Sequence, residues 1–275
     1  MADFGVMPEH KTKKKKTPTV DVDAISRLPF QSAVCQPDQD RRSMKGILVI
    51  GSEQTEVGKS TLATNIAVMA ANKGRRVCLY DTDLVHTVRD WAERRSSRAD
   101  PELDHIDVIV PAPSVVNEEP GAMREDLDKL RAEYELIVVD VPNTLSFGTY
   151  RAFSLADRIL VPVVHGTLNH TEKTLRYISD FRQRVPTSLV YNQVRDGDIS
   201  SNESRLVKQY GVFFLKTQIA HRVAWRSTFD LGLSVCEGVG DQHDDKAIAE
   251  LECLYCELEY RAPDTARQIY SKPRE

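Results

Sequence analysis

The sequence predicts a single α/β domain in which a mainly parallel, twisted sheet carries helices on both faces. From residue 45 onward, short and almost uninterrupted apolar runs alternate with longer helical patterns, as expected for strands buried on both sides. Polar motifs follow several of these runs, at the strand ends where open α/β sheets bind ligands. A chain of 275 residues is long enough to build one such core.

The elements follow from the apolar pattern in order along the chain. Residues 46–51, GILVIG, are predicted to form the first strand, and residues 60–73 a helix that ends at Gly74. Further strands are expected at residues 76–81, 106–110, 136–140, 158–164, 188–192 and 212–215. Further helices are expected at residues 86–95, 118–133, 169–184, 201–210, 223–231 and 244–260.

Residues 1–44 are polar and weakly patterned, and they predict a flexible basic extension before a domain at 45–262 and a tail at 263–275. The extension carries five lysines within six residues, Lys11 and 13–16. Such a run is either a solvated tail or a non-specific contact to nucleic acid, and both can hold. Charges stand where a signal peptide needs an apolar stretch, and no apolar run is long enough to span a membrane. We therefore expect a cytoplasmic protein.

The turn after the first predicted strand carries a phosphate-loop motif. In G-x-x-x-x-G-K-[ST] a glycine would stand at 53, where this chain has Glu53, so only the GKST half is intact. Backbone N–H groups there would hold a β-phosphate, Lys59 would reach the β- and γ-phosphates, and Ser60 would bind Mg²⁺. The alternative is a polar turn in which GKST arose by chance. The predicted nucleotide-binding residues are Thr55, Glu56, Val57, Gly58, Lys59, Ser60 and Thr61.

Carboxylates follow two other predicted strands. Asp81 and Asp83 come at the end of the second, and Asp140 ends the fourth. Carboxylates beside a phosphate loop are what Mg²⁺ and an attacking water require. Asp140 is expected to bind the metal, while Asp83 or Asp81 would orient the water. The alternative for each is helix capping, which is common for Asp at such turns.

Four segments together resemble the ParA/MinD family of deviant Walker ATPases, across residues 46–240. They are VIGSEQTEVGKSTLATNIA at the phosphate loop, VCLYDTDLVHTVRDWAERR at the second strand, YELIVVDVP at the fourth strand, and HRVAWRSTFDLGLSV near the end of the domain. The resemblance implies a P-loop ATPase that binds ATP and Mg²⁺, forms an ATP-dependent dimer, and positions DNA or another cargo.

The same resemblance implies roles for single residues. Lys59, Asp83 and Asp81 would be catalytic, Ser60, Asp83 and Asp140 would hold Mg²⁺, and Asn192 would contact the adenine. It also implies non-specific DNA binding in the ATP state and release by a cargo-bound, ParB-like activator protein. Candidate DNA contacts are Lys13, Lys14, Lys15, Lys16, Arg205, Lys208, Lys216, Arg222 and Arg226.

This sequence departs from the family pattern at two places. The signature lysine falls on Gln54, whose neutral amide cannot neutralise transition-state charge. Hydrolysis would then be slow, or Lys73 or Arg89 would substitute. The usual P-Q-G after the switch aspartate is replaced by residues 84–86, Leu-Val-His.

Three other functions fit parts of the pattern. A membrane-binding helix at 244–260 is disfavoured, because Glu250, Glu252, Glu257 and Glu259 oppose its apolar stripe. A bacterial tyrosine kinase shares GKS, but Tyr255, Tyr260 and Tyr270 form no tight cluster. A nucleotide-dependent scaffold that does not hydrolyse ATP is the third alternative, suggested by Glu53 and Gln54.

Overall fold

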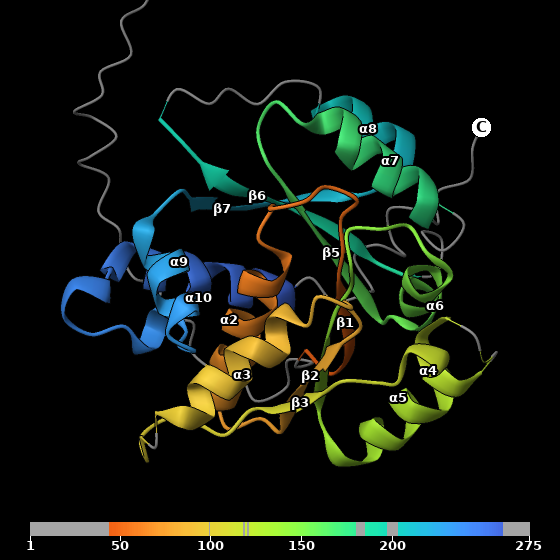
Figure 1. Ribbon diagram of the computed structural model, residues 1–275. Coiled ribbons are helices and arrows are strands. Elements are labelled where there is room, and N and C mark those ends of the chain that lie inside the picture. Colours follow the sequence, from red (N-terminus) through yellow and green to blue (C-terminus); the bar gives the residue numbers. More distant parts are fainter. Residues whose placement is uncertain are drawn as a thin grey trace, which may run out of the picture. The chain divides into compact units, whose positions relative to one another are not determined.

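The computed structural model describes residues 44–98, 100–117, 119, 121–179, 185–196 and 203–260. It confirms the predicted fold class: seven parallel strands form one sheet with helices on both faces (Figure 1). From edge to edge the strands are β3 (Asp107–Ile109), β2 (Val77–Asp81), β4 (Leu136–Asp140), β1 (Gly46–Ile50), β5 (Arg158–Val163), β6 (Thr187–Val194) and β7 (Phe213–Ala220).

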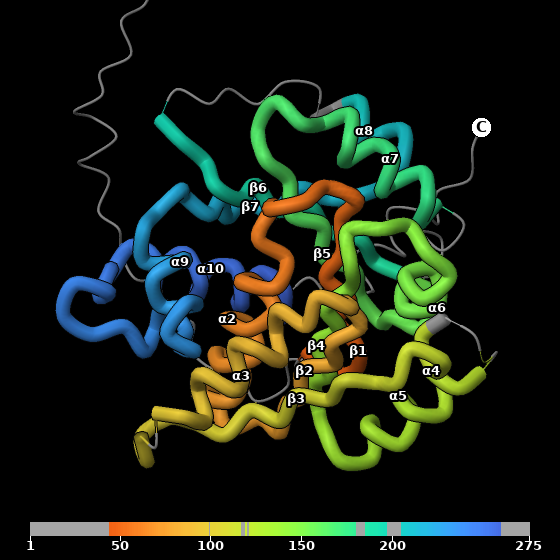
Figure 2. The backbone as a smooth tube through the Cα atoms, in the orientation of Figure 1, coloured from red at the N-terminus to blue at the C-terminus, as the bar shows by residue number. Residues whose placement is uncertain are grey.

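The sheet is buried on both sides because successive strand residues face two separate cores. In β1, Leu48 and Ile50 pack into one core, while Ile47 and Val49 pack into the other. The same alternation holds in β2 and β4. An almost uninterrupted apolar run is therefore what a central strand here needs. Figure 2 shows β1, in orange, at the middle of the sheet and the loop that leads from it to the next helix.

Helices of the described residues divide between the two faces. The first face is covered by α2 (Lys59–Asn72), α3 (Thr87–Ser97), α9 (Val223–Asp230) and α10 (Asp245–Tyr260). The second is covered by α4 (Pro113–Asn117), α5 (Ala122–Glu133), α6 (Phe147–Leu155), α7 (Leu168–Ile178) and α8 (Glu203–Tyr210). Two short 3₁₀ helices, η1 (Val235–Glu237) and η2 (Gly240–Gln242), connect α9 to α10.

The expected elements differ from the observed ones mainly at their ends. The helix predicted from residue 118 begins at Ala122 as α5, because Gly121 adopts a left-handed φ of 93° just before it. Helix α6, which begins after the capping Ser146, was not predicted. Strand β7 extends to Ala220, beyond the expected 215. Residues 1–43 of the predicted extension 1–44 lie outside the described residues, as do the predicted tail and part of the helices expected at 169–184 and 201–210.

Helix α10 covers one edge of the sheet. Its predicted apolar stripe packs into the core, with Leu251, Leu254 and Tyr255 fully buried, so that interpretation is confirmed. Of the acidic residues expected opposite this stripe, Glu252 is exposed, whereas Glu250 and Glu257 are half-buried against β7. Glu257 accepts hydrogen bonds from the Lys216 and Thr217 N–H groups of β7, and Glu250 accepts one from the Ala220 N–H. These carboxylates accept hydrogen bonds from N–H groups of the edge strand β7 that would otherwise face solvent.

Among the helices in the described part of the chain, none is both long and apolar enough to cross a bilayer.

Candidate functional site

The phosphate loop lies between β1 and α2, as the motif predicts. Gly58 has a left-handed φ of 83° immediately before the helix, and Glu56 has one of 56°. Lys59 is 9% exposed, and its Nζ donates to the Gln54 carbonyl oxygen at 3.3 Å. The lysine is therefore folded back over its own loop. Burial lowers the pKa of its ammonium, and the nearby Asp140 carboxylate opposes that shift.

The predicted metal ligands Ser60 and Asp140 are in direct contact. The Ser60 hydroxyl donates to Asp140 Oδ2 at 2.6 Å, although the two residues are 80 positions apart. The other oxygen, Oδ1, is buried and has no hydrogen-bond partner among the described residues. A hydroxyl beside an unsatisfied carboxylate oxygen is the donor chemistry that Mg²⁺ prefers. The site therefore fits the metal that the motif implies.

Asp140 is also electrostatically unfavourable without a cation. Burial raises the pKa of its carboxyl to about 7, and the Ser60 hydrogen bond only partly opposes this. The neighbouring Asp81 carboxylate adds to the shift. A bound divalent ion would remove this unfavourable charge.

The two aspartates of the D-x-D segment have different surroundings. Asp81 is 1% exposed and accepts hydrogen bonds from the Asp83 N–H and, at 3.2 Å, from the Arg89 N–H in the first turn of α3. Burial raises the pKa of its carboxyl. Asp83 instead lines the cavity, and its carboxylate accepts from the Val85 N–H. The structure thus brings Asp83 to the site, while Asp81 lies beneath it and supports the loop.

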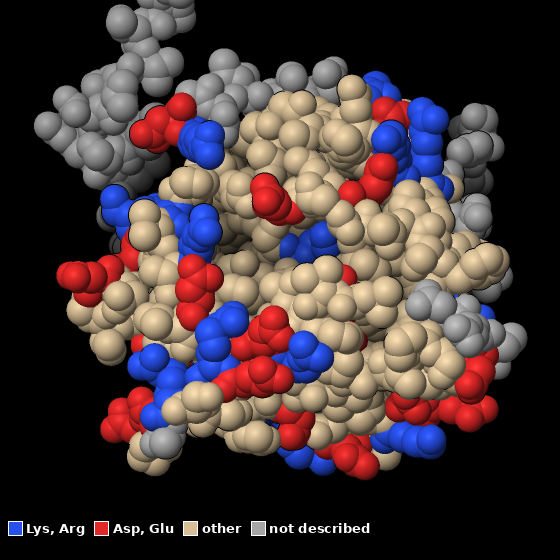
Figure 3. All heavy atoms as spheres, in the orientation of Figure 1, with Lys and Arg blue, Asp and Glu red and all other residues tan. Residues whose placement is uncertain are grey.

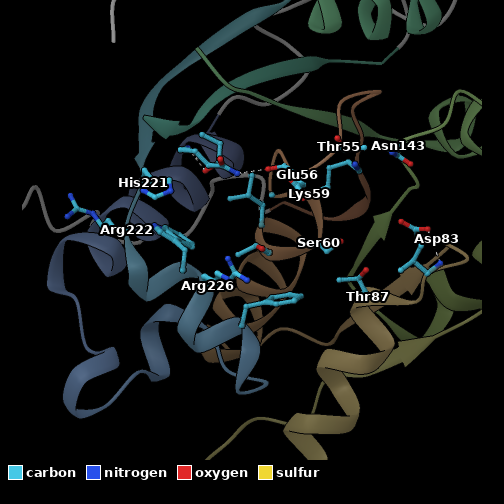
Figure 4. Close-up of a pocket in the computed structure, with 18 of the residues that line it drawn as sticks. Thr55, Glu56, Lys59, Ser60, Asp83, Thr87, Asn143, His221, Arg222 and Arg226 are labelled. Atoms are coloured by element: carbon cyan, nitrogen blue, oxygen red, sulfur yellow. Dashed lines mark hydrogen bonds between the residues drawn. The ribbon is translucent and has the colours of Figure 1, made fainter. Parts of the chain in front are cut away.

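A cavity of about 870 Å³ opens over these groups. Figure 4 shows Lys59 and Ser60 between Asp83 on one side and His221, Arg222 and Arg226 on the other. Of the predicted nucleotide-binding residues, those that line it are Thr55, Glu56, Gly58, Lys59, Ser60, Thr61 and Asn192. Val57 does not line it and is fully buried.

Sequence reasoning missed part of the cavity wall. Helix α9 contributes Trp225 and Phe229, His221 follows directly after β7, and Asn143 follows β4. In the sequence, the HRVAWR segment indicates the family resemblance and offers candidate DNA contacts. Its aromatic residues at i and i+4, a spacing that shares one helix face, were the available signal.

The cations proposed to replace the signature lysine are not beside the phosphate loop. Lys73 caps the far end of α2 and lies 5.6 Å from the centre of the Tyr255 ring. Arg89 is paired with Asp90 and Glu93 on α3. Lys173 on α7 does reach the loop, where its Nζ lies 3.1 Å from Glu53 Oε1. It balances the charge of the residue that occupies the missing glycine position.

The candidate DNA contacts of the described residues do not form one surface. Arg205 on α8 is paired with Glu172 at 2.8 Å, and Arg222 before α9 with Glu250 at 2.8 Å. Lys208 and Arg226 are exposed, the latter with a side chain 90% accessible. On the side of the molecule seen in Figure 3, basic and acidic side chains are interspersed. Lys216 on β7 is exposed, and the remaining candidates, Lys13 to Lys16, lie outside the described residues.

Comparison with known proteins gives consistent matches. The family described as CobQ/CobB/MinD/ParA nucleotide binding domain matches residues 48–232. The septum site-determining protein MinD of Bacillus subtilis is 23% identical over 174 residues, 54% of this chain and 65% of that protein. The chromosome partitioning protein ParA of Myxococcus xanthus is 25% identical over 145 residues, 42% of this chain and 51% of that protein. The matches thus span about half to two thirds of these relatives.

Among solved structures, a putative plasmid partition protein from Borrelia burgdorferi bound to AMPPNP superposes with a TM-score of 0.58. The two chains are 16% identical, and the match covers 78% of this chain and 98% of that one. At 16% identity, the similarity indicates a shared fold and nothing more specific.

Proposed function

Because the chain belongs to the CobQ/CobB/MinD/ParA family of nucleotide-binding domains, we propose that it is an ATPase that acts as a switch. In this proposal it binds ATP with Mg²⁺, dimerises in the ATP state, and releases its partner on hydrolysis. The switch would partition or position DNA or another intracellular cargo and would answer to a cargo-bound activator protein. The partition and septum-site relatives support the cargo-positioning part of the proposal.

The observation that carries the proposal is the contact between Ser60 and Asp140 beside Lys59. Two oxygen donors from distant segments meet at 2.6 Å, and one buried carboxylate oxygen is left without a partner. A buried polar atom of this kind is costly unless a ligand satisfies it. A phosphate loop next to it makes a magnesium-bound triphosphate the ligand that fits best.

Each residue would then have one role. Ser60 and Asp140 would hold Mg²⁺, which when bound offsets negative charge on the phosphate oxygens. Lys59 would leave the Gln54 carbonyl and bind the phosphates, aided by backbone N–H groups at the start of α2. Asp83 would orient the attacking water by accepting its hydrogen bond. Asp81 would hold the Asp83 segment in place.

Calorimetric titration with Mg·ATP tests the binding step. The wild-type protein should bind, and Lys59→Ala should weaken binding by about 10- to 100-fold, the effect of one charge-assisted contact. Lys246→Ala, which removes an exposed lysine on α10, is the matched control and should bind as the wild type does. Absence of binding by folded wild-type protein would refute the proposed function.

A scaffold that binds nucleotide without hydrolysing it is the second candidate, favoured by the absence of a cation at Gln54. Measuring ATP turnover with DNA and the cognate activator separates the two. The ATPase loses its stimulated rate on Asp83→Ala, whereas a scaffold shows the same background rate in both proteins. A tyrosine kinase receives less support, because Tyr255 is fully buried in the core.

DNA binding is tested by gel shift with non-specific duplex. Binding should require Mg·ATP and should be lost in Lys59→Ala. If the basic extension contributes, removal of residues 1–17 should weaken binding and flatten its salt dependence, because fewer counterions are released. Equal binding by all proteins with and without nucleotide would contradict the switch.

A further inference from the structure

The side chain of Asn192, at the end of β6, is bonded to the phosphate loop. Its Nδ2 donates to the Val57 carbonyl oxygen at 2.7 Å, and its Oδ1 accepts from the Gln193 N–H at 3.0 Å. Only 6% of the residue is exposed. Both ends of the amide are therefore engaged within the protein, although the family resemblance implies that this residue contacts the adenine.

The loop and the end of β6 are fitted closely to each other at this point. A Cβ at Gly58 would lie 2.4 Å from Asn192 Nδ2, so only glycine permits the approach. The next residue, Gln193, has a left-handed φ of 57° and donates from its side chain to the Glu56 carbonyl oxygen. Two consecutive loop carbonyls thus point at the end of β6.

Fixing those carbonyls also fixes the N–H groups that follow them. In a trans peptide the C=O and the next N–H point in opposite directions. When the Val57 carbonyl is held by Asn192, the Gly58 N–H is turned away from β6. When the Glu56 carbonyl is held by Gln193, the same applies to the Val57 N–H. N–H groups of this loop are the ones that would bind phosphate oxygens.

We propose that Asn192 is a positioning residue for the triphosphate, which acts by holding the Val57 carbonyl and so orienting the phosphate loop. This inference rests on the proposed function. It differs from a base contact in one respect: removal of the Asn192 amide weakens binding of the phosphates themselves, even for a ligand that has no base.

The test compares Mg·ATP with magnesium-bound inorganic tripolyphosphate by calorimetry on the full chain. Asn192→Ala should weaken the binding of both ligands by the same factor, about 5- to 20-fold, as expected for loss of one buried hydrogen bond. Weaker binding of ATP with unchanged binding of tripolyphosphate would show that Asn192 serves the base, and it would overturn the inference. Unchanged binding of both ligands would overturn it too.

A second variant and a second measurement guard against misfolding. Gln193→Ala removes the neighbouring bond at a more exposed position and should give the same equal loss for both ligands, smaller in size. Hydrogen exchange of the nucleotide-free Asn192→Ala protein should be faster in the phosphate loop than in the wild type, while exchange in β1 is unchanged. Unaltered loop exchange would contradict the positioning role. If the wild type binds neither ligand, the proposed function itself fails.

Discussion

Asp81 and Asp140 are register partners on the neighbouring strands β2 and β4. Both are almost completely buried, and burial raises the pKa of both carboxyls. Burial of two adjacent carboxyls reduces the stability of the nucleotide-free protein, and the nearby Lys59 ammonium offsets this only in part. Asp81 and Asp140 therefore lower the stability of the protein when no metal ion is bound.

Asp140→Asn should therefore stabilise the nucleotide-free protein, and more so at high pH. The carboxyl has a pKa of 3.8 when unperturbed and about 7 in the fold. Between these values the folded chain retains a proton that the unfolded chain has lost, so the stability contributed by Asp140 falls as pH rises. Urea denaturation should show a gain about 1–3 kcal/mol larger at pH 8 than at pH 5. An equal gain at both pH values would contradict the assignment.

His86 stands where the family pattern has glycine, and it has a left-handed φ of 55°. A non-glycine residue in that region is strained by about 1 kcal/mol. Comparing His86→Gly with His86→Ala isolates the backbone, since both lose the imidazole. The glycine variant should have the larger free energy of unfolding, by about 0.5–1 kcal/mol, in urea denaturation. A more stable alanine variant would show that the turn is not strained.

At the scale of elements, the fit between α10 and β7 shows why acidic residues stand on a packed helix. Glu257 accepts from the Thr217 N–H and hydroxyl, both at 2.7 Å. The glutamates complete hydrogen bonds along an edge strand that has no further strand beside it among the described residues. An edge closed in this way is protected from pairing with another chain.

Glu257→Ala should lower the free energy of unfolding by about 1–2 kcal/mol, because it leaves two edge N–H groups without their acceptor. It should also increase self-association, measured by light scattering at high protein concentration. Glu252→Ala on the same helix is the control, since Glu252 is exposed and makes no hydrogen bond to the described residues. Equal behaviour of the two variants would show that the edge contacts contribute little.

Elements and residues with a strong local signal could be predicted from the sequence. LIVVD gives β4 at the bounds observed, and GKST gives the loop and the start of α2. Helix α6 lacked such a signal, because FGTYRAFSL carries a glycine and only a short apolar pattern. The spacing of Trp225 and Phe229 indicates a shared helix face, but their place in the cavity wall could not be predicted, because it depends on how α9 packs against the distant helix α2.

At the scale of the whole molecule, the parallel sheet brings the ends of several strands to one cavity. β1 leads into Lys59, β2 into Asp83, β4 into Asn143, β6 into Asn192 and β7 into His221. Because all strands run in the same direction, all these residues emerge at the same end of the sheet. The site is therefore a property of the topology rather than of one segment.

The proposed dimerisation is a prediction at this scale. Asp83→Ala should bind Mg·ATP but hydrolyse it slowly, so the ATP-bound dimer should persist and sediment at twice the monomer mass. Lys59→Ala should stay monomeric under the same conditions, since it binds nucleotide weakly. Sedimentation velocity with and without Mg·ATP measures both. A monomeric Asp83→Ala protein saturated with nucleotide would contradict an ATP-dependent dimer.

The cavity wall formed by α9 has a mechanical consequence. The floor of the cavity comes from β1, the phosphate loop and α2, and its far wall comes from residues that follow β7. A ligand that fills the cavity would contact both the phosphate loop and α9, which lie near opposite ends of the domain in sequence, and would stabilise them together. Occupancy should then slow local unfolding of α9 as strongly as that of the phosphate loop, and the early and late segments would open together rather than separately.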